Sequence, residues 1–424
     1  MLSGRGKLSS MSSPSTIVAD EDRATEGGAA YAQGNAGRER LEGTPPPEAM
    51  RLVILGSSIT ALAIAREAHS LGLRPVIVDS NSGIAHRSSL VERVPFQEGD
   101  EVDILDQVRG LGGPDACLIS TADLWLRFLR RNREALEGAF RSVLHPSNEA
   151  LDICLSKAAF ADWCLANRFD APRYCRGDDA PCLHGIRYPV LVRPAETLHH
   201  HSRSGIPKAV EAGSPEELGG LLERFRAAGA AALVAESLLG QRLIQYSVPF
   251  ARRGSEILSF VAQKVRPPAD WCSTGTCVEL SPNAEVEALA RRSVEALDYF
   301  GIGEVEILHS LDADRSYLVE INARPWVQYS LATASGHNFL GFLLWPDRAD
   351  RPLTVKRGLT WLNFSDDSYV CFSRSQGIVR RGRLSAFDYL RSVLRANVYA
   401  LFSWRDPKPW LLGSLDWLRS LANR

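Results

Sequence analysis

Residues 303–326, GEVEILHSLDADRSYLVEINARPW, are the stretch of the sequence that decides the fold. The segment from Val305 to His309 alternates between apolar and polar residues, as a half-buried strand does. A polar turn of Asp and Arg residues follows, and Tyr317 to Asn322 forms a return strand of the same kind. The pattern therefore predicts a β-hairpin whose apolar face packs on a core.

The polar face of this hairpin predicts a site for a hard cation. Side chains alternate in a strand, so Glu306, Glu320 and Asn322 are expected on the same side. Two carboxylates and an amide oxygen suit Mg²⁺ (or Mn²⁺) shared with phosphate oxygens. Arg324 has the same strand parity and adds a planar cation for a phosphoryl group. The alternative is an ordinary solvated strand.

The composition is that of a globular protein with room for two or three domains. The chain has 424 residues, of which 45% are hydrophobic and 23% are charged, and its formal net charge is −1. This charge gives no reason to expect a nucleic acid as the partner. The eight cysteines form no C-x-x-C pair, which argues against zinc and a disulfide framework and fits the reducing cytoplasm. No apolar run is long enough to span a bilayer. We therefore expect a cytoplasmic protein.

The chain begins with a segment that cannot form a core. Residues 1–49 are rich in Gly, Ser, Pro, Glu and Arg and contain few large apolar residues. We expect a disordered N-terminal tail, with Met50 as the natural beginning of the fold. Whether the tail is part of the native protein is left open.

Residues 51–79 show a strand, a glycine turn, a helix and a second strand that ends at Asp79. This is a βαβ unit of the doubly wound type, which predicts a Rossmann-like domain over 50–145. The turn, GSSITA, has only the first glycine of G-x-G-x-x-G. An NAD-dependent oxidoreductase is therefore the weakest of the functions that we consider.

The hairpin also carries a family resemblance. The order V-E, turn, E-I-N-A-R-P resembles the metal-binding signature of the ATP-grasp ligases. The closing EINARPW followed by SLATASGHNF is similar to the bacterial branch of predicted ATP-grasp carboxylate–amine ligases, relatives of carbamoyl-phosphate synthase and biotin carboxylase. The resemblance implies an α/β (α+β) architecture. An ATP-grasp domain over 146–345, divided into 146–235 and 236–345, follows the Rossmann-like domain.

The resemblance assigns roles to residues before the hairpin. Lys157, near the start of a long helix that begins at Ser147, is expected to reach the nucleotide phosphates. Arg193 stands where the family has a lysine that contacts phosphate. Glu236, Leu238 and Gly240 resemble the hinge that binds adenine. The loop 197–208, with His199–His201, corresponds to a phosphate-covering lid, and the alternative of a metal site at the histidines is weak.

Two further segments complete the expected site and the chain. Lys264 and Arg266 have the same strand parity and are expected to point into the cleft together, as catalytic groups with Arg324. Residues 346–424 are rich in aromatic residues and arginine, and we expect an extension packed on the catalytic domain. There are two alternatives: the last helix contacts a membrane surface, or the basic residues contact nucleic acid.

Together these features predict an ATP- and Mg²⁺-dependent carboxylate–amine ligase. The resemblance implies an acylphosphate intermediate, release of ADP and phosphate, and formation of an amide. The alternatives are a non-catalytic or regulatory ATP-binding module and a carboxylase or kinase of the same fold. The substrates are expected to be a small carboxylate and a small amine, which the sequence does not name, and a homodimer is an open alternative.

Overall fold

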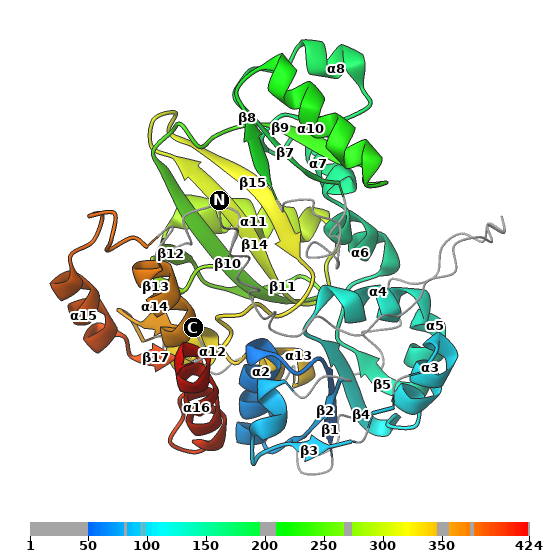
Figure 1. The fold of residues 1–424 in the computed structure, drawn as a ribbon. Helices are drawn as coiled ribbons and strands as arrows, with labels where there is room; N and C mark the ends of the chain where they lie inside the picture. The colour runs from blue at the N-terminus through cyan, green and yellow to red at the C-terminus, as the bar shows by residue number, and fades with distance from the viewer. Residues whose placement is uncertain are drawn as a thin grey trace.

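The structure of the protein is a computed structural model, which describes residues 50–79, 83–94, 96–97, 99–195, 209–266, 274–345, 356–373 and 377–422. The predicted tail and the predicted lid, including His199–His201, lie outside the described residues. Three sheets organise the rest of the chain (Figure 1).

The first sheet is parallel and has the strand order β3-β2-β1-β4-β5. Its strands are β1 (Arg51–Leu55), β2 (Arg74–Val78), β3 (Glu92–Arg93), β4 (Gly113–Ser120) and β5 (Phe140–Val143). The helical segments around it are α2 (Ile59–Ser70), η2 (Ile84–Arg87), α3 (Glu101–Arg109), α4 (Asp123–Arg131) and α5 (Arg133–Ala139). Val53 and Leu55 belong to one hydrophobic core, and Leu52 and Ile54 belong to another. Both faces of the sheet are therefore buried, as the continuous apolar run of β1 predicts.

A second, antiparallel sheet forms a cap at the top of the molecule (Figure 1). Its order is β6 (Tyr174–Arg176), β9 (Ala232–Glu236), β7 (Val190–Pro194) and β8 (Val210–Ala212). The helices α8 (Ala180–His184) and α10 (Pro215–Ala227) belong to the same part of the chain. A separate small core that includes Val190, Val192 and Phe225 holds the cap together.

The long helix predicted from Ser147 is broken in two. It forms α6 (Asn148–Leu155) and α7 (Lys157–Ala166), because Ser156 has an extended backbone with φ −115° and ψ 118°. The Ser156 hydroxyl accepts a hydrogen bond from the amide of Ala159 and caps α7. Lys157 is therefore the first residue of a helix, and its amide donates to the carbonyl of Ala195.

The third sheet has eight strands and carries the predicted hairpin. The order is β15 (Arg315–Asn322), β14 (Gly301–Ser310), β10 (Leu243–Arg253), β12 (Ala262–Arg266), β13 (Cys277–Leu280), β16 (Thr360–Leu362) and β17 (Val398–Tyr399), and β11 (Glu256–Ser259) pairs with β10. The helices α11 (Ala284–Ala296), α12 (Ser330–Ser335) and α13 (Phe339–Leu344) complete this part. Gly301 has φ +113°, and a Cβ there would lie 2.7 Å from the Leu144 carbonyl oxygen, so the hairpin requires glycine where it meets the first domain.

The C-terminal extension is built into this sheet. It supplies β16 and β17, together with α14 (Phe364–Phe372), α15 (Ala386–Arg395) and α16 (Lys408–Ala422). The indole of Trp361 on β16 is fully buried, and its Nε1 donates to Ser330 Oγ at 3.0 Å. In Figure 1 the extension runs along the lower left of the molecule and ends beside the first domain.

These sheets and helices confirm the predicted α/β (α+β) fold class, with parallel and antiparallel sheets.

The cysteine spacing argued against disulfides, and this expectation was wrong for one pair. Cys175 and Cys182 form a disulfide, since β6 and α8 bring their Cα atoms to 5.6 Å. None of the described helices is long and apolar enough to cross a membrane.

Candidate active site

A cleft of about 270 Å³ lies where the large sheet, the cap and the start of α4 meet. Its walls contain nine of the predicted site residues: Lys157, Arg193, Glu236, Leu238, Lys264, Glu306, Glu320, Asn322 and Arg324. Two others, Arg266 and Gly240, are absent from its lining. The tertiary structure thus brings together residues that are up to 167 positions apart in the sequence.

The predicted cation ligands share one end of the hairpin. Glu306 pairs directly with Glu320 across the two strands, and Asn322 pairs with Glu304. A bulge follows at once, because Ile307 pairs with Leu318. Such a bulge bends and twists a strand, which re-aims the side chains beside it. The polar face of the hairpin is therefore shaped at the position of the two glutamates.

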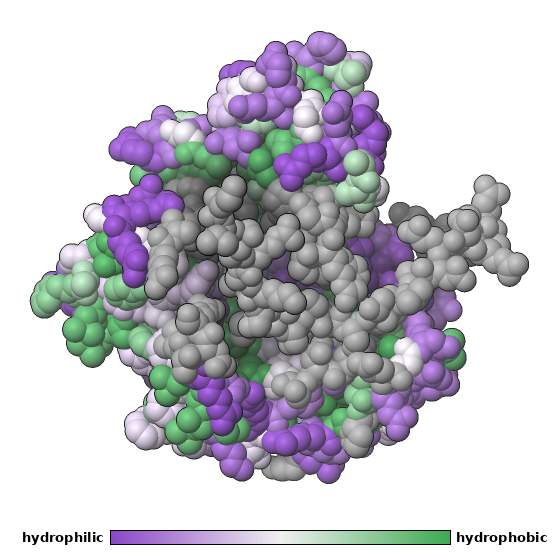
Figure 2. Space-filling model, viewed as in Figure 1, coloured by the Kyte–Doolittle hydropathy of each residue, from purple (hydrophilic) through white to green (hydrophobic). Residues whose placement is uncertain are grey.

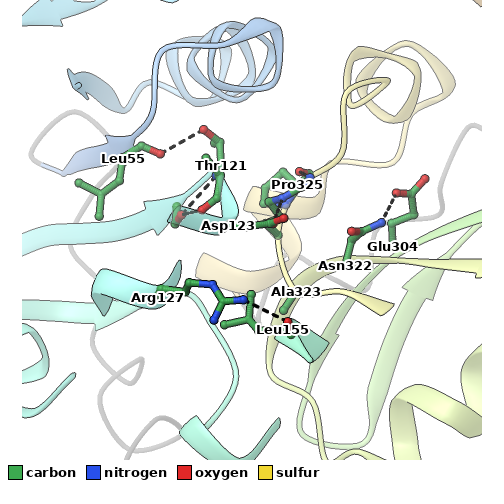
Figure 3. Close-up of polar contacts among 12 residues, drawn as sticks. Leu55, Thr121, Asp123, Arg127, Leu155, Glu304, Asn322, Ala323 and Pro325 are labelled. Atoms are coloured by element: carbon green, nitrogen blue, oxygen red, sulfur yellow. Dashed lines mark hydrogen bonds and ion pairs between the residues drawn. The ribbon is translucent and has the colours of Figure 1, made fainter. Parts of the chain in front are cut away.

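Glu304 is a buried member of this group that the sequence analysis missed. Its carboxylate accepts hydrogen bonds from the Ser247 hydroxyl and from Asn322 Nδ2, the latter at 3.0 Å (Figure 3). Burial, and next the neighbouring Glu306, raise the pKa of Glu304 to about 7, although Lys264 acts in the opposite direction. A signal was present in the sequence, since Glu304 has the same strand parity as Glu306.

Glu306 is held by two partners from neighbouring strands. Lys264 Nζ lies 2.9 Å from Glu306 Oε1, and Gln245 Nε2 donates to Glu306 Oε2 at 3.1 Å. Burial acts to lower the pKa of Lys264, but the surrounding carboxylates raise it on balance, so the ammonium stays charged. The expectation that Lys264 points into the cleft agrees with this geometry.

The donors on this wall fit a magnesium ion that shares phosphate oxygens. In the described part of the chain, no three His, Cys, Asp or Glu side chains lie close enough to enclose a metal ion by themselves. The amide of Asn322 donates to Glu304, which leaves its carbonyl oxygen for a cation beside Glu306 and Glu320. Gln245 Oε1 is also buried and accepts no hydrogen bond from the described residues. Oxygen donors from a bound phosphate would complete such a site.

Arg324 connects the hairpin to the first domain. Its Nε donates to Asp123 Oδ1 at the start of α4, and both side chains line the cleft. Figure 3 shows Asp123 facing the segment that contains Ala323 and Pro325. Buried His145 supports the same segment, since its Nε2 accepts from the Ser120 amide at 2.6 Å and its Nδ1 lies 3.2 Å from the Ala323 carbonyl. Burial lowers the pKa of His145 to about 3, so the ring is neutral and bridges the two domains.

The prediction that Arg266 points into the cleft beside Lys264 was wrong. A bulge lies between the two residues on β12, and Arg266 forms a bidentate ion pair with buried Asp367, at 2.9 and 3.0 Å. Its Nη1 also donates to Ser392 at 3.0 Å. Arg266 therefore anchors the C-terminal extension, because the bulge turns it away from the hairpin carboxylates and toward the buried carboxylate of Asp367.

The opposite wall belongs to the cap and to α7. Lys157 and Arg193 are the cations of this wall, and Arg193 Nε is buried without a hydrogen-bond partner among the described residues. Glu236 and Leu238 follow at the end of β9. The Glu236 carboxylate accepts a weak hydrogen bond from the Arg187 amide at 3.4 Å. Arg187 Nε and Arg173 Nη1 lie 3.5 and 4.0 Å from its Oε1. Gly240 lies beyond this wall.

The three sheets and the cleft between cap and hairpin define an ATP-grasp fold. Three solved structures illustrate the likeness. Carboxyaminoimidazole ribonucleotide synthase from Aspergillus clavatus, complexed with ATP, matches at a TM-score of 0.58 and 13% identity over 74% of this chain and 81% of its own. L-amino acid ligase from Bacillus licheniformis matches at a TM-score of 0.53 and 16% identity over 70% of this chain and 74% of its own.

The third structure is the biotin carboxylase domain dimer of Hydrogenobacter thermophilus 2-oxoglutarate carboxylase, in complex with MgADP, ADP and bicarbonate. It matches at a TM-score of 0.57 and 12% identity over 73% of each chain. The sequence matches no protein-family model and none of the curated proteins. At these identities the likeness shows the fold.

Proposed function

We propose that this chain is an ATP- and Mg²⁺-dependent carboxylate–amine ligase. One observation carries the proposal: the acidic and amide side chains of the hairpin face a cleft whose other wall supplies Lys157 and Arg193. Anionic ligands on one side and cations on the other are what a magnesium-bound triphosphate needs. The similar folds include an L-amino acid ligase, a carboxyaminoimidazole ribonucleotide synthase with bound ATP and a 2-oxoglutarate carboxylase domain with bound MgADP.

The cap wall would hold the nucleotide. Arg193 has a buried guanidinium nitrogen without a partner among the described residues, and a phosphate oxygen would satisfy it. Lys157 lies at the first turn of α7, where the positive end of the helix dipole also favours a phosphate. Glu236 and the backbone at Leu238 lie at the adenine end of this wall.

The hairpin wall would hold the metal ion. Glu306, Glu320 and Asn322 are the residues that would bind Mg²⁺, and Glu304 fixes the Asn322 amide so that its carbonyl oxygen is available. When bound, the ion would neutralise charge on the phosphates. Lys264 holds Glu306 in place and compensates for the clustered carboxylates.

The reaction that fits these groups has two steps. A substrate carboxylate oxygen attacks the γ-phosphorus, the bond from phosphorus to ADP breaks, and an acylphosphate forms. An amine nitrogen then attacks the acyl carbon, the bond to phosphate breaks, and an amide, phosphate and a proton are released. Arg324, oriented by Asp123, would bind the carboxylate or the phosphoryl oxygens. Positioning and charge stabilisation are the main tasks of the protein.

A carboxylase of the same fold is the second candidate, because the 2-oxoglutarate carboxylase domain holds MgADP and bicarbonate in such a fold. The experiment is ADP release from Mg-ATP against amino acids and small carboxylates, tested singly and in pairs, with and without bicarbonate. The ligase requires turnover that depends on an acid together with an amine. Turnover that depends on bicarbonate alone would favour the carboxylase.

Three variants connect the result to the hairpin. Glu320→Ala and Asn322→Ala are expected to abolish ADP release. Asp314→Asn, in the turn of the same hairpin and outside the cleft, is expected to keep it. Asn tolerates the φ of +48° found at that position. ATP binding without turnover across the whole panel would instead indicate a regulatory module, and full activity in both alanine variants would refute the assignment of the site.

A further inference from the structure

The helix α15 presents an apolar face to solvent. Phe387, Leu390 and Leu394 are 72%, 55% and 75% exposed, and their spacing places them along one side of the helix. Apolar surface is visible over this helix at the left margin of the molecule (Figure 2). Single exposed apolar residues are common on protein surfaces, but three on one face of a ten-residue helix form a continuous stripe.

The opposite face of α15 is fixed to the body of the protein. Tyr389 is buried and lies against Phe372, with ring centroids 4.9 Å apart. The Arg266 guanidinium lies 5.8 Å from the centre of the Tyr389 ring and donates to Ser392. The helix therefore already uses its inner face, and the stripe of Phe387, Leu390 and Leu394 is a second face.

Exposed arginines lie on α15 and in the segment just before it. Five exposed arginines lie in residues 377–395: Arg380, Arg381, Arg383, Arg391 and Arg395. The same stretch contains one acid, Asp388, which accepts from Ser385. The stretch thus has a formal charge of +4 in a protein whose net charge is −1.

We propose that α15 and the arginine-rich turn before it dock this protein on an anionic lipid bilayer. An apolar helix face flanked by arginines combines the two contributions that hold an interfacial helix, apolar burial among acyl chains and attraction to anionic headgroups. A second copy of this chain would bring five further arginines against the first five, and like charges repel. A nucleic acid would use the arginines and leave Leu390 and Leu394 in water.

The test is flotation of the full-length protein with vesicles of phosphatidylcholine, alone or mixed with phosphatidylserine, at low and at high salt. The protein is expected to float with the mixed vesicles at low salt and to be released by high salt, because screening weakens the headgroup attraction. The fraction of protein that floats with the mixed vesicles is expected to fall at least roughly tenfold in each of two variants. One is Leu390→Asn/Leu394→Asn, and the other is Arg380→Gln/Arg381→Gln/Arg383→Gln.

The control variant is Leu411→Asn/Leu415→Asn on α16, whose leucines are 49% and 48% exposed but lie outside the arginine-rich stretch. It is expected to float like the wild type, and circular dichroism checks that every variant is folded. Absence of flotation with mixed vesicles at low salt, or unchanged flotation of the α15 variant, would overturn the proposal. Equal loss in the α16 variant would also overturn it. Light scattering would contradict the proposal if it showed a dimer that only the α15 substitutions dissociate. Binding to RNA that depends on the arginines but not on the leucines would contradict it as well.

Discussion

Lys264 Nζ lies 2.9 Å from Glu306 Oε1 in the wall of the cleft, and the two residues come from strands β12 and β14. The side chain of Lys264 is 3% exposed, so the ammonium has almost no contact with water. It compensates for the negative charge of Glu304, Glu306 and Glu320. Removing one partner of such a pair therefore costs more than removing both.

Lys264→Met is expected to lower the free energy of unfolding by about 3 kcal/mol, because it leaves the part-buried Glu306 and the buried Glu304 without their cation. The double variant Lys264→Met/Glu306→Gln is expected to recover most of this loss. Both variants are expected to lose ATP-dependent turnover. Urea denaturation combined with an ADP-release assay measures the two effects, and a double variant that is less stable than the single one would contradict the prediction.

Asp123→Asn tests the contact that orients Arg324 across the two domains. The amide keeps the size of the side chain but removes the charge that holds the guanidinium. We expect kcat/KM for ligation to fall roughly tenfold, the equivalent of one charge-assisted hydrogen bond. Nucleotide affinity, measured by isothermal titration calorimetry with ATP, is expected to stay unchanged. A matching loss of ATP affinity would show that Asp123 acts on the nucleotide instead.

Glu67 predicts a pH dependence of stability. This buried carboxylate accepts from the Tyr329 hydroxyl and from the Leu340 amide at 3.2 Å, yet burial raises its pKa from 4.5 to about 7. A raised pKa means that the folded state holds the proton more tightly. The contribution to stability is therefore complete below pH 4.5 and is lost as the pH rises through about 7.

Between about pH 5 and about pH 8, the free energy of unfolding of the wild type is expected to fall by about 3 kcal/mol more than that of Glu67→Gln. Denaturation curves at the two pH values provide the measurement. Glu285→Gln, on the exposed side of α11, is the control for the loss of a single charge. Parallel pH profiles for wild type and Glu67→Gln would show that Glu67 is not the group responsible.

The extension is anchored to the first domain by Asp406, which is fully buried. Asp406 accepts from Arg66 Nε at 3.1 Å and from the Ser89 amide at 3.1 Å. Asp406→Ala is expected to cost about 3–5 kcal/mol, because the Arg66 guanidinium loses its buried partner. Asp416→Ala breaks the half-exposed pair with Arg87 and is expected to cost less than about 1 kcal/mol. Chemical denaturation compares the two, and equal losses would mean that burial does not set the difference.

The sequence by itself was sufficient for the hairpin and for the side on which Glu306, Glu320 and Asn322 lie. Strand alternation is a local property, so the parity of Glu306, Glu320 and Asn322 could be predicted from the 17 consecutive residues 306–322. The buried run of β1 and the cap of α6 by Ser147 are local in the same sense. The resemblance of EINARPW then predicted a fold that the structure confirms.

Only the tertiary structure decided which partner each polar group has. Arg266 and Lys264 share a strand parity, but the buried carboxylate of Asp367, 101 residues further on, binds Arg266 and leaves Lys264 to Glu306. Asp123 and His145 join the hairpin by contacts across about 200 residues, and the Cys175–Cys182 bridge depends on how β6 meets α8. The physical reason is that charge pairing and burial depend on distance in space. Local sequence fixes the direction of a side chain, whereas packing of distant elements fixes what lies there.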